Sequence, residues 1–348
     1  MTTNKMQLTN QTGSDFWNDS CDIAELRDAV AQGAVGATSN PVIVSTVVKK
    51  NPSTWGVFLA RLIQDNPTDN ENEIARKLTA ELAGTAAKLL LPAFENSNRS
   101  KGRLAIQVDP SDFRNPRNMI AMARDLNRLA PNLTIKLPAT AAGVVAMEEL
   151  TAEGITVTAT VCFGVSQAVA CAEAIERGLK RGKHDLHPFI AIMVGRLDDH
   201  LKRVMEAKGI VTDPGNLEWA GVAAFKKSYG IFRERGYSST LLAAAYRNHM
   251  QWSEFLGGKV VLSMPYLWWN RFNASDIEVR SRMDDPVDPR IIQELRNKFT
   301  DFSRAYDENG MKPAEFAGFG STVHTLAQFL KARDELTGMI RERMLALA

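Results

Sequence analysis

The sequence of 348 residues has no long apolar runs, and none approaches the roughly 20 residues that a membrane-spanning helix requires. It also has no secretory signal at its start, because the polar segment Met1–Gln7 contains no apolar core. We therefore expect a protein that neither inserts into a membrane nor is exported. Cytoplasmic localisation is the resulting expectation.

Cysteine is scarce, and its pattern is uninformative for metal binding. Cys21, Cys162 and Cys171 lie among apolar or small residues and form no CxxC pair. This pattern indicates cysteines that remain reduced, as free thiols, and pack in the protein interior. The polar segment His184–His187 has an HxxH spacing but no further ligands nearby, so we expect no metal site.

An excess of charge of one sign is also absent. Lys and Arg number 42 against 40 Asp and Glu, the formal net charge is +2, and the basic residues are spread along the chain. Nothing here predicts a nucleic-acid partner. The apolar fraction of 45% and the charged fraction of 24% are instead typical of a soluble globular protein.

What the sequence does contain is a series of eight short, mostly apolar segments separated by helical patterns. Continuous apolar strands are typical of parallel sheets that are buried on both faces. Pro41 biases Asn40 toward an extended backbone, and we expect it to stop the second strand. The predicted strands are residues 14–19, 34–40, 103–109, 133–140, 156–163, 189–195, 240–246 and 259–264.

Eight strands alternating with helices predict a (β/α)₈ TIM barrel. A doubly wound open sheet is the main competitor, but the glycine-rich phosphate turn expected after its first strand is missing. No repeat, low-complexity tract or linker divides the chain. We expect one domain over residues 1–348, with a barrel core at about 14–265 and a helical extension at about 266–348. Extra helices are expected at 54–92 and in that extension, which ends in a long helix from about Ser321 to Leu345.

One predicted strand carries a lysine, Lys136, in its middle. Burial of an ammonium group is costly and lowers its pKa, which leaves a neutral amine able to attack a carbonyl and form a Schiff base. The alternative is a lysine at an exposed strand edge, or one that reaches outward to solvent. The segment alone leaves both interpretations open.

Further polar residues recur at the predicted strand ends, where the active site of such a barrel lies. Each alone has an ordinary explanation as a cap, a turn former or a strand residue. Together they predict a site in which an amine forms an imine, an acid breaks a C–C bond and two arginines hold a phosphate. These residues are Asp19, Thr38, Asn40, Gln107, Asp109, Thr158, Thr160, Arg196, Arg247 and Asn248.

Several motifs in this order and spacing resemble the transaldolase family. The resemblance extends over roughly residues 15–265, and its most specific parts are the Thr-Ser-Asn-Pro segment and the lysine segment. The motifs are Asn18–Ile23, Ala37–Pro41, Thr134–Thr140, Glu149–Ile155, Phe163–Glu173, Val194–Asp199 and Ala245–Asn248.

The resemblance implies an enzyme of the pentose phosphate pathway type that transfers a dihydroxyacetone unit from a ketose phosphate to an aldose phosphate. It implies no metal, no organic cofactor and, as an expectation for assembly, a homodimer. In this chain the Schiff-base lysine would be Lys136 and the acid/base Asp19, while Thr160 would help to hold the catalytic water. The substrate-binding residues would be Asn40, Thr38, Thr158, Arg196 and Arg247.

The chain departs from the family pattern inside the predicted pocket. Gln107 stands where many transaldolases have a glutamate, and it resembles the glutamine of the related fructose-6-phosphate aldolases. A lyase that releases dihydroxyacetone is therefore an alternative. Met193 stands where those aldolases use a tyrosine. Thr158 replaces a usual asparagine, and Ala191 and Ala245 replace usual serines. These losses leave a third alternative, a sugar-phosphate binder without turnover.

Two further segments have competing explanations. Gly318–Ser321 could cradle a phosphate, but we expect a turn in which Ser321 caps the last helix. We expect Asp198 and Asp199 to open a helix, where negative charge suits the helix dipole.

Overall fold

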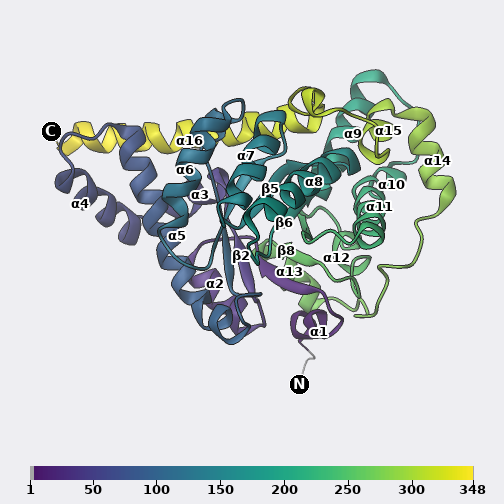
Figure 1. Ribbon diagram of the computed structural model, residues 1–348, viewed down its shortest axis with the longest axis horizontal. Coiled ribbons are helices and arrows are strands. Elements are labelled where there is room, and N and C mark those ends of the chain that lie inside the picture. The colour runs from purple at the N-terminus through teal and green to yellow at the C-terminus, as the bar shows by residue number, and fades with distance from the viewer. Residues whose placement is uncertain (1–3, 348) are drawn as a thin grey trace.

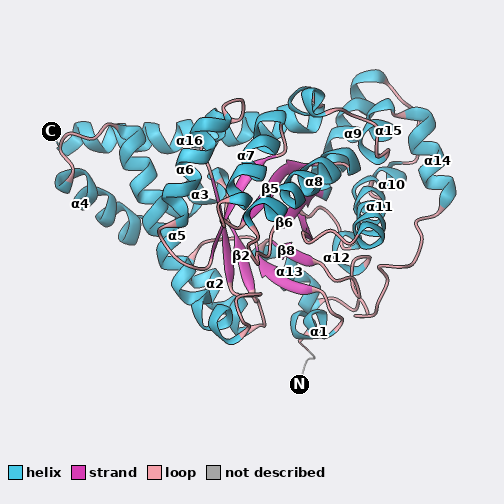
Figure 2. Cartoon of the chain, in the orientation of Figure 1, coloured by secondary structure: helices cyan, strands magenta, loops and turns pink. Residues whose placement is uncertain are grey.

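The computed structural model describes residues 4–347, so the first three residues of the Met1–Gln7 segment and the last residue of the chain lie outside the described part. Eight parallel strands close into a barrel in chain order, and β1 pairs with β8 to complete the circle. Figure 2 shows the strands at the centre with helices around them. The strands are β1 (Asp15–Asn18), β2 (Gly36–Thr38), β3 (Arg103–Gln107), β4 (Leu133–Pro138), β5 (Val157–Cys162), β6 (Phe189–Met193), β7 (Thr240–Ala244) and β8 (Val261–Met264).

Helices follow every strand, and several lie outside the barrel repeat (Figure 1). The predicted (β/α)₈ barrel with extra helices is therefore confirmed. The helices are α1 (Lys5–Gln11), α2 (Ile23–Ala31), α3 (Pro41–Lys50), η1 (Pro52–Gly56), α4 (Val57–Asp65), α5 (Glu71–Asn96), η2 (Pro110–Asp112), α6 (Pro116–Asn127), α7 (Ala141–Ala152), α8 (Val165–Gly182), α9 (Val194–Lys208), α10 (Pro214–Leu217), α11 (Ala220–Arg235), α12 (Met250–Ser253), α13 (Tyr266–Ala274), α14 (Pro289–Lys298), α15 (Thr300–Tyr306), η3 (Pro313–Gly318) and α16 (Gly320–Leu347).

The boundaries differ from the prediction at two functionally important places. Pro41 does not merely stop a strand: it is the first residue of α3, a position that suits its fixed φ and missing N–H. The sixth strand ends at Met193, so Arg196 lies in the first turn of α9 rather than after a strand. The apolar run continues unbroken from strand into helix, and periodicity alone cannot separate the two.

The lower half of the barrel interior is filled by side chains. Successive strand residues point to opposite faces, and the inward ones form a buried cluster that includes Trp17, Ala105, Phe189, Leu242 and Val261. The rings of Trp17 and Phe189 meet edge to face with centroids 4.9 Å apart. This layer fills the N-terminal part of the barrel interior. The inward-facing residues further along the strands therefore line the C-terminal mouth of the barrel.

The C-terminal helix α16 lies across that end of the barrel (Figure 1). It contacts β5, α9 and the turn η2 that follows β3, and then packs on α3 and α5. Arg333 of α16 binds Asp109 at 3.0 Å, which ties the helix to the end of β3. The extension therefore reaches the predicted active-site end of the barrel.

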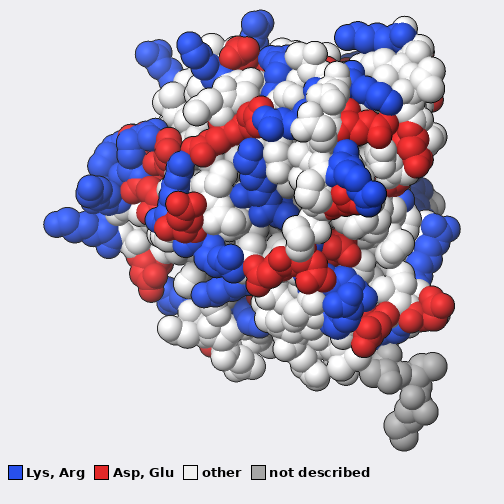
Figure 3. All heavy atoms as spheres, turned by 90° about the vertical axis from the view of Figure 1, so that its right-hand side faces the viewer, with Lys and Arg blue, Asp and Glu red and all other residues white. Residues whose placement is uncertain are grey.

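On the face shown in Figure 3, basic and acidic side chains are interspersed. Among residues 4–347, no helix combines the length and apolarity that a membrane crossing would require.

Candidate active site

Strand register brings the predicted site residues to one opening. Gln107 is the register partner of Lys136, and Lys136 is the partner of Thr158. Register partners in a parallel sheet point to the same face, and Thr38 shares this orientation through its partner Ala105, a residue of the buried interior layer. The structure thus gathers these side chains at the mouth of the barrel.

Lys136 is buried, with 6% of its surface exposed. Its Nζ donates a hydrogen bond of 2.8 Å to the carbonyl oxygen of Ser39, the residue after β2. Burial lowers the pKa of Lys136 to about 8, although the nearby Asp19 carboxylate acts in the opposite direction. The alternative of an exposed or outward-reaching lysine is therefore wrong, and the pKa of about 8 leaves about a tenth of the amine neutral at pH 7.

Asp19 follows β1 and is held by the hydroxyl of Thr38, which in turn contacts the hydroxyl of Ser263. Thr38 Oγ1 donates to Asp19 Oδ1 at 2.5 Å, and Thr38 Oγ1 also lies 2.6 Å from Ser263 Oγ on β8. Burial raises the pKa of Asp19, while Lys136 and the Thr38 hydrogen bond act to lower it. The amine and the carboxyl are thus shifted toward each other, which is the arrangement expected of groups that exchange protons near neutral pH.

Ser263 was missed at the sequence level because a serine within an apolar strand carries no signal of its own. Its register partner Trp17 belongs to the buried interior layer, so Ser263 also faces inward. Period-two alternation along 261–263 could have placed it there, had the strand bounds been known.

Strand β5 is irregular where the predicted water-holding threonine lies. Its register with β6 shifts between Ala159 and Cys162, and Val161 has a φ of 51°, which is strained for a β-branched residue. Thr160 lies at this irregularity, 1% exposed, with its hydroxyl 4.0 Å from Met193 Sδ. Thr158 lies deeper, and its hydroxyl pairs with that of Thr134 at 2.8 Å.

Gln107 is almost fully buried, at 7% exposed. Among the residues that the structure describes, neither its amide oxygen nor its amide nitrogen has a hydrogen-bond partner. Buried amides are normally satisfied, so an unsatisfied one facing a barrel mouth is suited to bind a substrate hydroxyl or water.

Asn40 has a local structural role. Its side-chain oxygen caps α3 by accepting from the backbone N–H groups of Val42 at 2.9 Å and Ile43 at 3.0 Å. The amide nitrogen remains as a donor at the edge of the mouth. A cavity of about 580 Å³ lies beside the mouth, between α5, α6 and α16, and its wall includes Ser39, Asn40 and Gln107.

The two predicted phosphate-binding arginines come together because α9 and the end of β7 pack closely. A Cβ atom on Gly195 would lie 2.2 Å from the carbonyl oxygen of Ala245 and 2.6 Å from Cγ of Arg247. Ala245 itself has a φ of 63°, which turns the chain sharply at this point. Burial lowers the pKa of Arg196 to about 10, with the positive charge of Arg247 as the next cause.

Arg247 is oriented by acidic and amide groups on its neighbours. It forms an ion pair of 2.8 Å with Asp199, and its backbone N–H donates to Gln251 Oε1 at 2.5 Å. Gln251 in turn donates to the buried Asp198 at 2.6 Å. Asp198 and Asp199 therefore do not open a helix as expected, since α9 begins at Val194; they hold the β7 end instead.

Chemically, the mouth provides a buried amine, a neighbouring carboxyl, an unsatisfied amide and two adjacent guanidinium groups. This set can form an imine with a ketone, break a C–C bond next to a hydroxyl and bind a phosphate. Among residues 4–347, no group of three or more His, Cys, Asp and Glu is placed to hold a metal ion.

Comparison with known proteins agrees with this chemistry. A family model described as Transaldolase/Fructose-6-phosphate aldolase matches residues 16–313. "Transaldolase 2" of Streptomyces coelicolor is 28% identical over 248 residues, which cover 67% of this chain and 65% of that protein. "Transaldolase" of Mycobacterium tuberculosis is 28% identical over 236 residues, which cover 64% of this chain and 62% of that protein. "Transaldolase" of Thermobifida fusca is 29% identical over 212 residues, 57% of each chain. The chain thus spans just under two thirds of the length of the first two relatives.

Proposed function

The chain belongs to the transaldolase/fructose-6-phosphate aldolase family, and from this premise we propose that it acts as a transaldolase. It would move a dihydroxyacetone unit from a ketose phosphate to an aldose phosphate through a Schiff base on Lys136. The resemblance detected in the motifs is confirmed at the level of the family. The observation that carries the proposed activity is the buried Lys136, with a pKa of about 8, beside Asp19.

In the proposed mechanism the neutral amine of Lys136 attacks the ketone carbonyl, and loss of water gives an iminium ion. Asp19 takes the proton from the hydroxyl on the second carbon beyond the iminium carbon, the bond that joins this carbon to the first one breaks, and its electron pair moves into the iminium to give an enamine. The aldose phosphate leaves and a second one enters. The steps then reverse, and hydrolysis frees the lysine. The raised pKa of Asp19 suits a group that must both accept and return a proton.

Water must enter and leave during imine formation and hydrolysis. Thr160 and Gln107 face the mouth with hydroxyl and amide groups able to orient that water. Because an amide cannot carry the proton, Asp19 remains the proton carrier in this proposal.

The substrate contacts divide into two sets. Arg196 and Arg247 would bind the phosphate, and the Asn40 amide nitrogen would donate to a substrate hydroxyl. Thr38 and Thr158 would act mainly through the groups that their hydroxyls contact, Asp19 and Thr134.

Trapping the imine tests the proposal. Borohydride reduction in the presence of fructose 6-phosphate should attach a reduced three-carbon unit to Lys136, detected by mass spectrometry of the digested protein. The Lys136→Met variant is the matched control and should remain unlabelled. Active wild-type protein with no adduct on Lys136 would contradict the mechanism.

Gln107 supports a second candidate, a lyase of the fructose-6-phosphate aldolase type that releases dihydroxyacetone. Free dihydroxyacetone should then accumulate without any aldose phosphate acceptor. Strict dependence of turnover on the acceptor would reject the lyase and favour transfer.

The missing pocket donors at Met193, Ala191 and Ala245 support a third candidate, a sugar-phosphate binder without turnover. In that case wild type would bind fructose 6-phosphate but exchange no carbon units. Measurable exchange between ketose and aldose phosphates would exclude it.

We further propose a cytoplasmic homodimer that serves the pentose phosphate pathway. Cys21, Cys162 and Cys171 are all buried and free, as suits a reducing compartment. Sedimentation equilibrium should give twice the chain mass of 38.4 kDa; a monomer mass at all concentrations would reject the dimer.

A further inference from the structure

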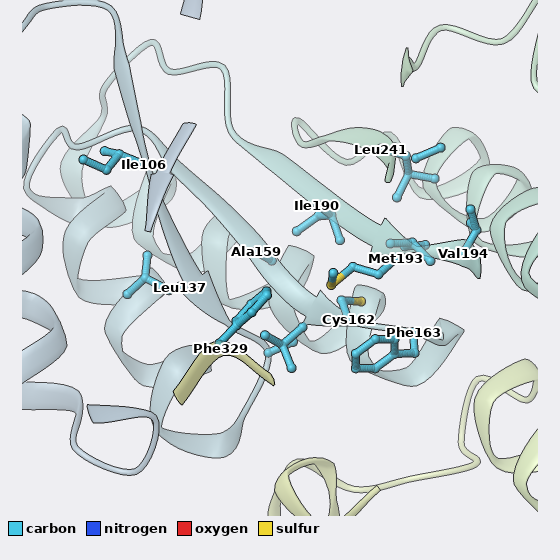
Figure 4. Packing of buried hydrophobic residues seen from close by; sticks show 14 of the residues in the cluster. Ile106, Leu137, Ala159, Cys162, Phe163, Ile190, Met193, Val194, Leu241 and Phe329 are labelled. Atoms are coloured by element: carbon cyan, nitrogen blue, oxygen red, sulfur yellow. The ribbon is translucent and has the colours of Figure 1, made fainter. Parts of the chain in front are cut away.

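Helix α16 lies wholly beyond residue 313, where the family match ends. Nevertheless it contacts β5 and α9, which carry Thr160 and Arg196. Figure 4 shows Phe329 of this helix among buried side chains of the barrel, with Leu137 and Met193 in the same cluster. A segment outside the matched region therefore forms part of the wall at the active-site end.

The most direct contact between α16 and the candidate site is made by Gln328. Arg196 Nη1 donates a hydrogen bond to Gln328 Oε1. The guanidinium carbon of Arg196 also lies 5.9 Å from the ring centre of Phe329, the next residue along. The Nε of Arg196 is buried and has no hydrogen-bond partner among the described residues. Gln328 itself lies on the exposed rim of the mouth.

The two arginines differ in how their charges are balanced. Arg247 is paired with Asp199 at 2.8 Å. Arg196 is held by a neutral amide and makes no ion pair within the described part of the chain. A neutral partner fixes the guanidinium in place without cancelling its charge, which preserves its attraction for an anion.

The same face of α16 carries further unused polar groups. Ser321 and Thr325 lie seven and three residues before Gln328, so helical periodicity places all three on one side. Both hydroxyls are at most 1% exposed and have no hydrogen-bond partner among the described residues. Ser321 is not the predicted cap, since the helix begins at Gly320 and Ser321 already lies in its first turn.

We propose that Gln328 is a third residue of the phosphate subsite, contributed by the C-terminal helix. Its amide oxygen holds Arg196, and its amide nitrogen donates to the substrate phosphate bound between Arg196 and Arg247. Gln328 is thereby a specificity residue that favours phosphorylated over unphosphorylated sugars. This inference rests on the proposed function and deepens it.

Kinetics with paired substrates test the role of Gln328. For Gln328→Ala we expect KM for fructose 6-phosphate to rise about tenfold, the effect of one charge-assisted hydrogen bond, with kcat changed less than about twofold. KM for unphosphorylated fructose as donor should stay unchanged. Gln328→Glu should raise KM for the phosphate ester further, because a carboxylate would pair with Arg196 and repel the phosphate. The control is Val323→Ala, at an exposed position of the same helix, which should behave as wild type.

Inorganic phosphate provides a readout that does not depend on the lysine chemistry. Its dissociation constant, measured by calorimetry on the full chain, should rise about tenfold in Gln328→Ala. Equal losses on phosphorylated and unphosphorylated donors, or unchanged phosphate binding, would overturn the inference. If wild type shows no turnover and no adduct, the proposed function fails, and the phosphate measurement still decides the role of Gln328.

Discussion

At the scale of single residues, the charges of the mouth are costly to keep. Among the described residues, Lys136 makes one hydrogen bond, to the carbonyl oxygen of Ser39. Asp19 accepts a hydrogen bond from Thr38 and lies in the electrostatic field of Lys136. Burial disfavours the charged form of each group, since it lowers the pKa of Lys136 and raises that of Asp19. The presence of these two groups in the mouth is what we expect of residues that serve reactivity at the expense of stability.

The pH dependence of imine formation follows from the lowered pKa of Lys136. The neutral amine is the nucleophile, and its fraction grows as pH rises through about 8. We expect the rate of borohydride-trapped labelling at low substrate to rise about tenfold per pH unit well below that value and to level off above it. A midpoint near 10.5, the ordinary lysine value, would contradict the burial effect.

The same shift predicts that Lys136→Met is more stable than wild type near pH 7. A fall in pKa from 10.5 to about 8 corresponds to roughly 3 kcal/mol. Between these two values the unfolded chain binds more protons, so wild-type stability rises with pH across that window, and the penalty is fully present below about pH 8. Loss of the hydrogen bond to Ser39 offsets part of the gain, so we expect about 1–3 kcal/mol.

Urea unfolding of both proteins at about pH 7 and about pH 10 measures this difference. The advantage of the variant should shrink at the higher pH. A variant that is less stable than wild type at pH 7 would show that Lys136 contributes net stabilising interactions.

Some of these site residues could be predicted from the sequence and others could not, depending on where in the chain they lie. Lys136 and Asp19 could be predicted because a charged residue inside an apolar strand, or directly after one, is conspicuous. Ser263 and Gln251 could not, because their roles depend on partners on other strands or helices that only the folded register identifies.

At the scale of elements, the junction of α9 with β7 positions the arginines. Gly195 allows the first turn of α9 to approach the backbone of Ala245. A residue with a Cβ atom at this position would force α9 or the end of β7 to shift. This contact was hidden from the sequence, where Gly195 was expected to end a strand. An apolar strand followed directly by an apolar helical turn gives one unbroken pattern.

We expect Gly195→Ala to separate α9 from β7 and to displace Arg247. The overpacking should cost about 1–3 kcal/mol of stability and raise KM for phosphorylated donors more than kcat falls. Steady-state kinetics and thermal unfolding measure the two effects. The control is Gly230→Ala inside α11, where the added methyl group meets nothing within 4 Å. It should leave the kinetics unchanged and raise stability by about 0.5–1 kcal/mol through the higher helix propensity of alanine. Unchanged kinetics in Gly195→Ala would show that the close approach does not position Arg247.

At the scale of the whole molecule, the C-terminal extension returns to the barrel. The ion pair of Arg333 with Asp109 joins residues 224 positions apart, and the sequence alone does not predict such a contact. The barrel itself was predictable, because eight apolar segments with helical spacing admit few other folds. The course of α16 was not, because an amphipathic helix indicates a partner surface without identifying it.

The packing of α16 on α3, α5, β5 and α9 supports our proposal that residues 1–348 form a single domain. If so, the extension cannot unfold before the barrel loses its buried contacts, and the intact protein should unfold in one calorimetric transition. The van't Hoff and calorimetric enthalpies should agree in that case. Phe329→Ala, which removes a fully buried ring of α16, should lower the midpoint of that one transition without splitting it. An early transition for the extension, separate from that of the barrel, would instead mean that α16 docks as an independent unit.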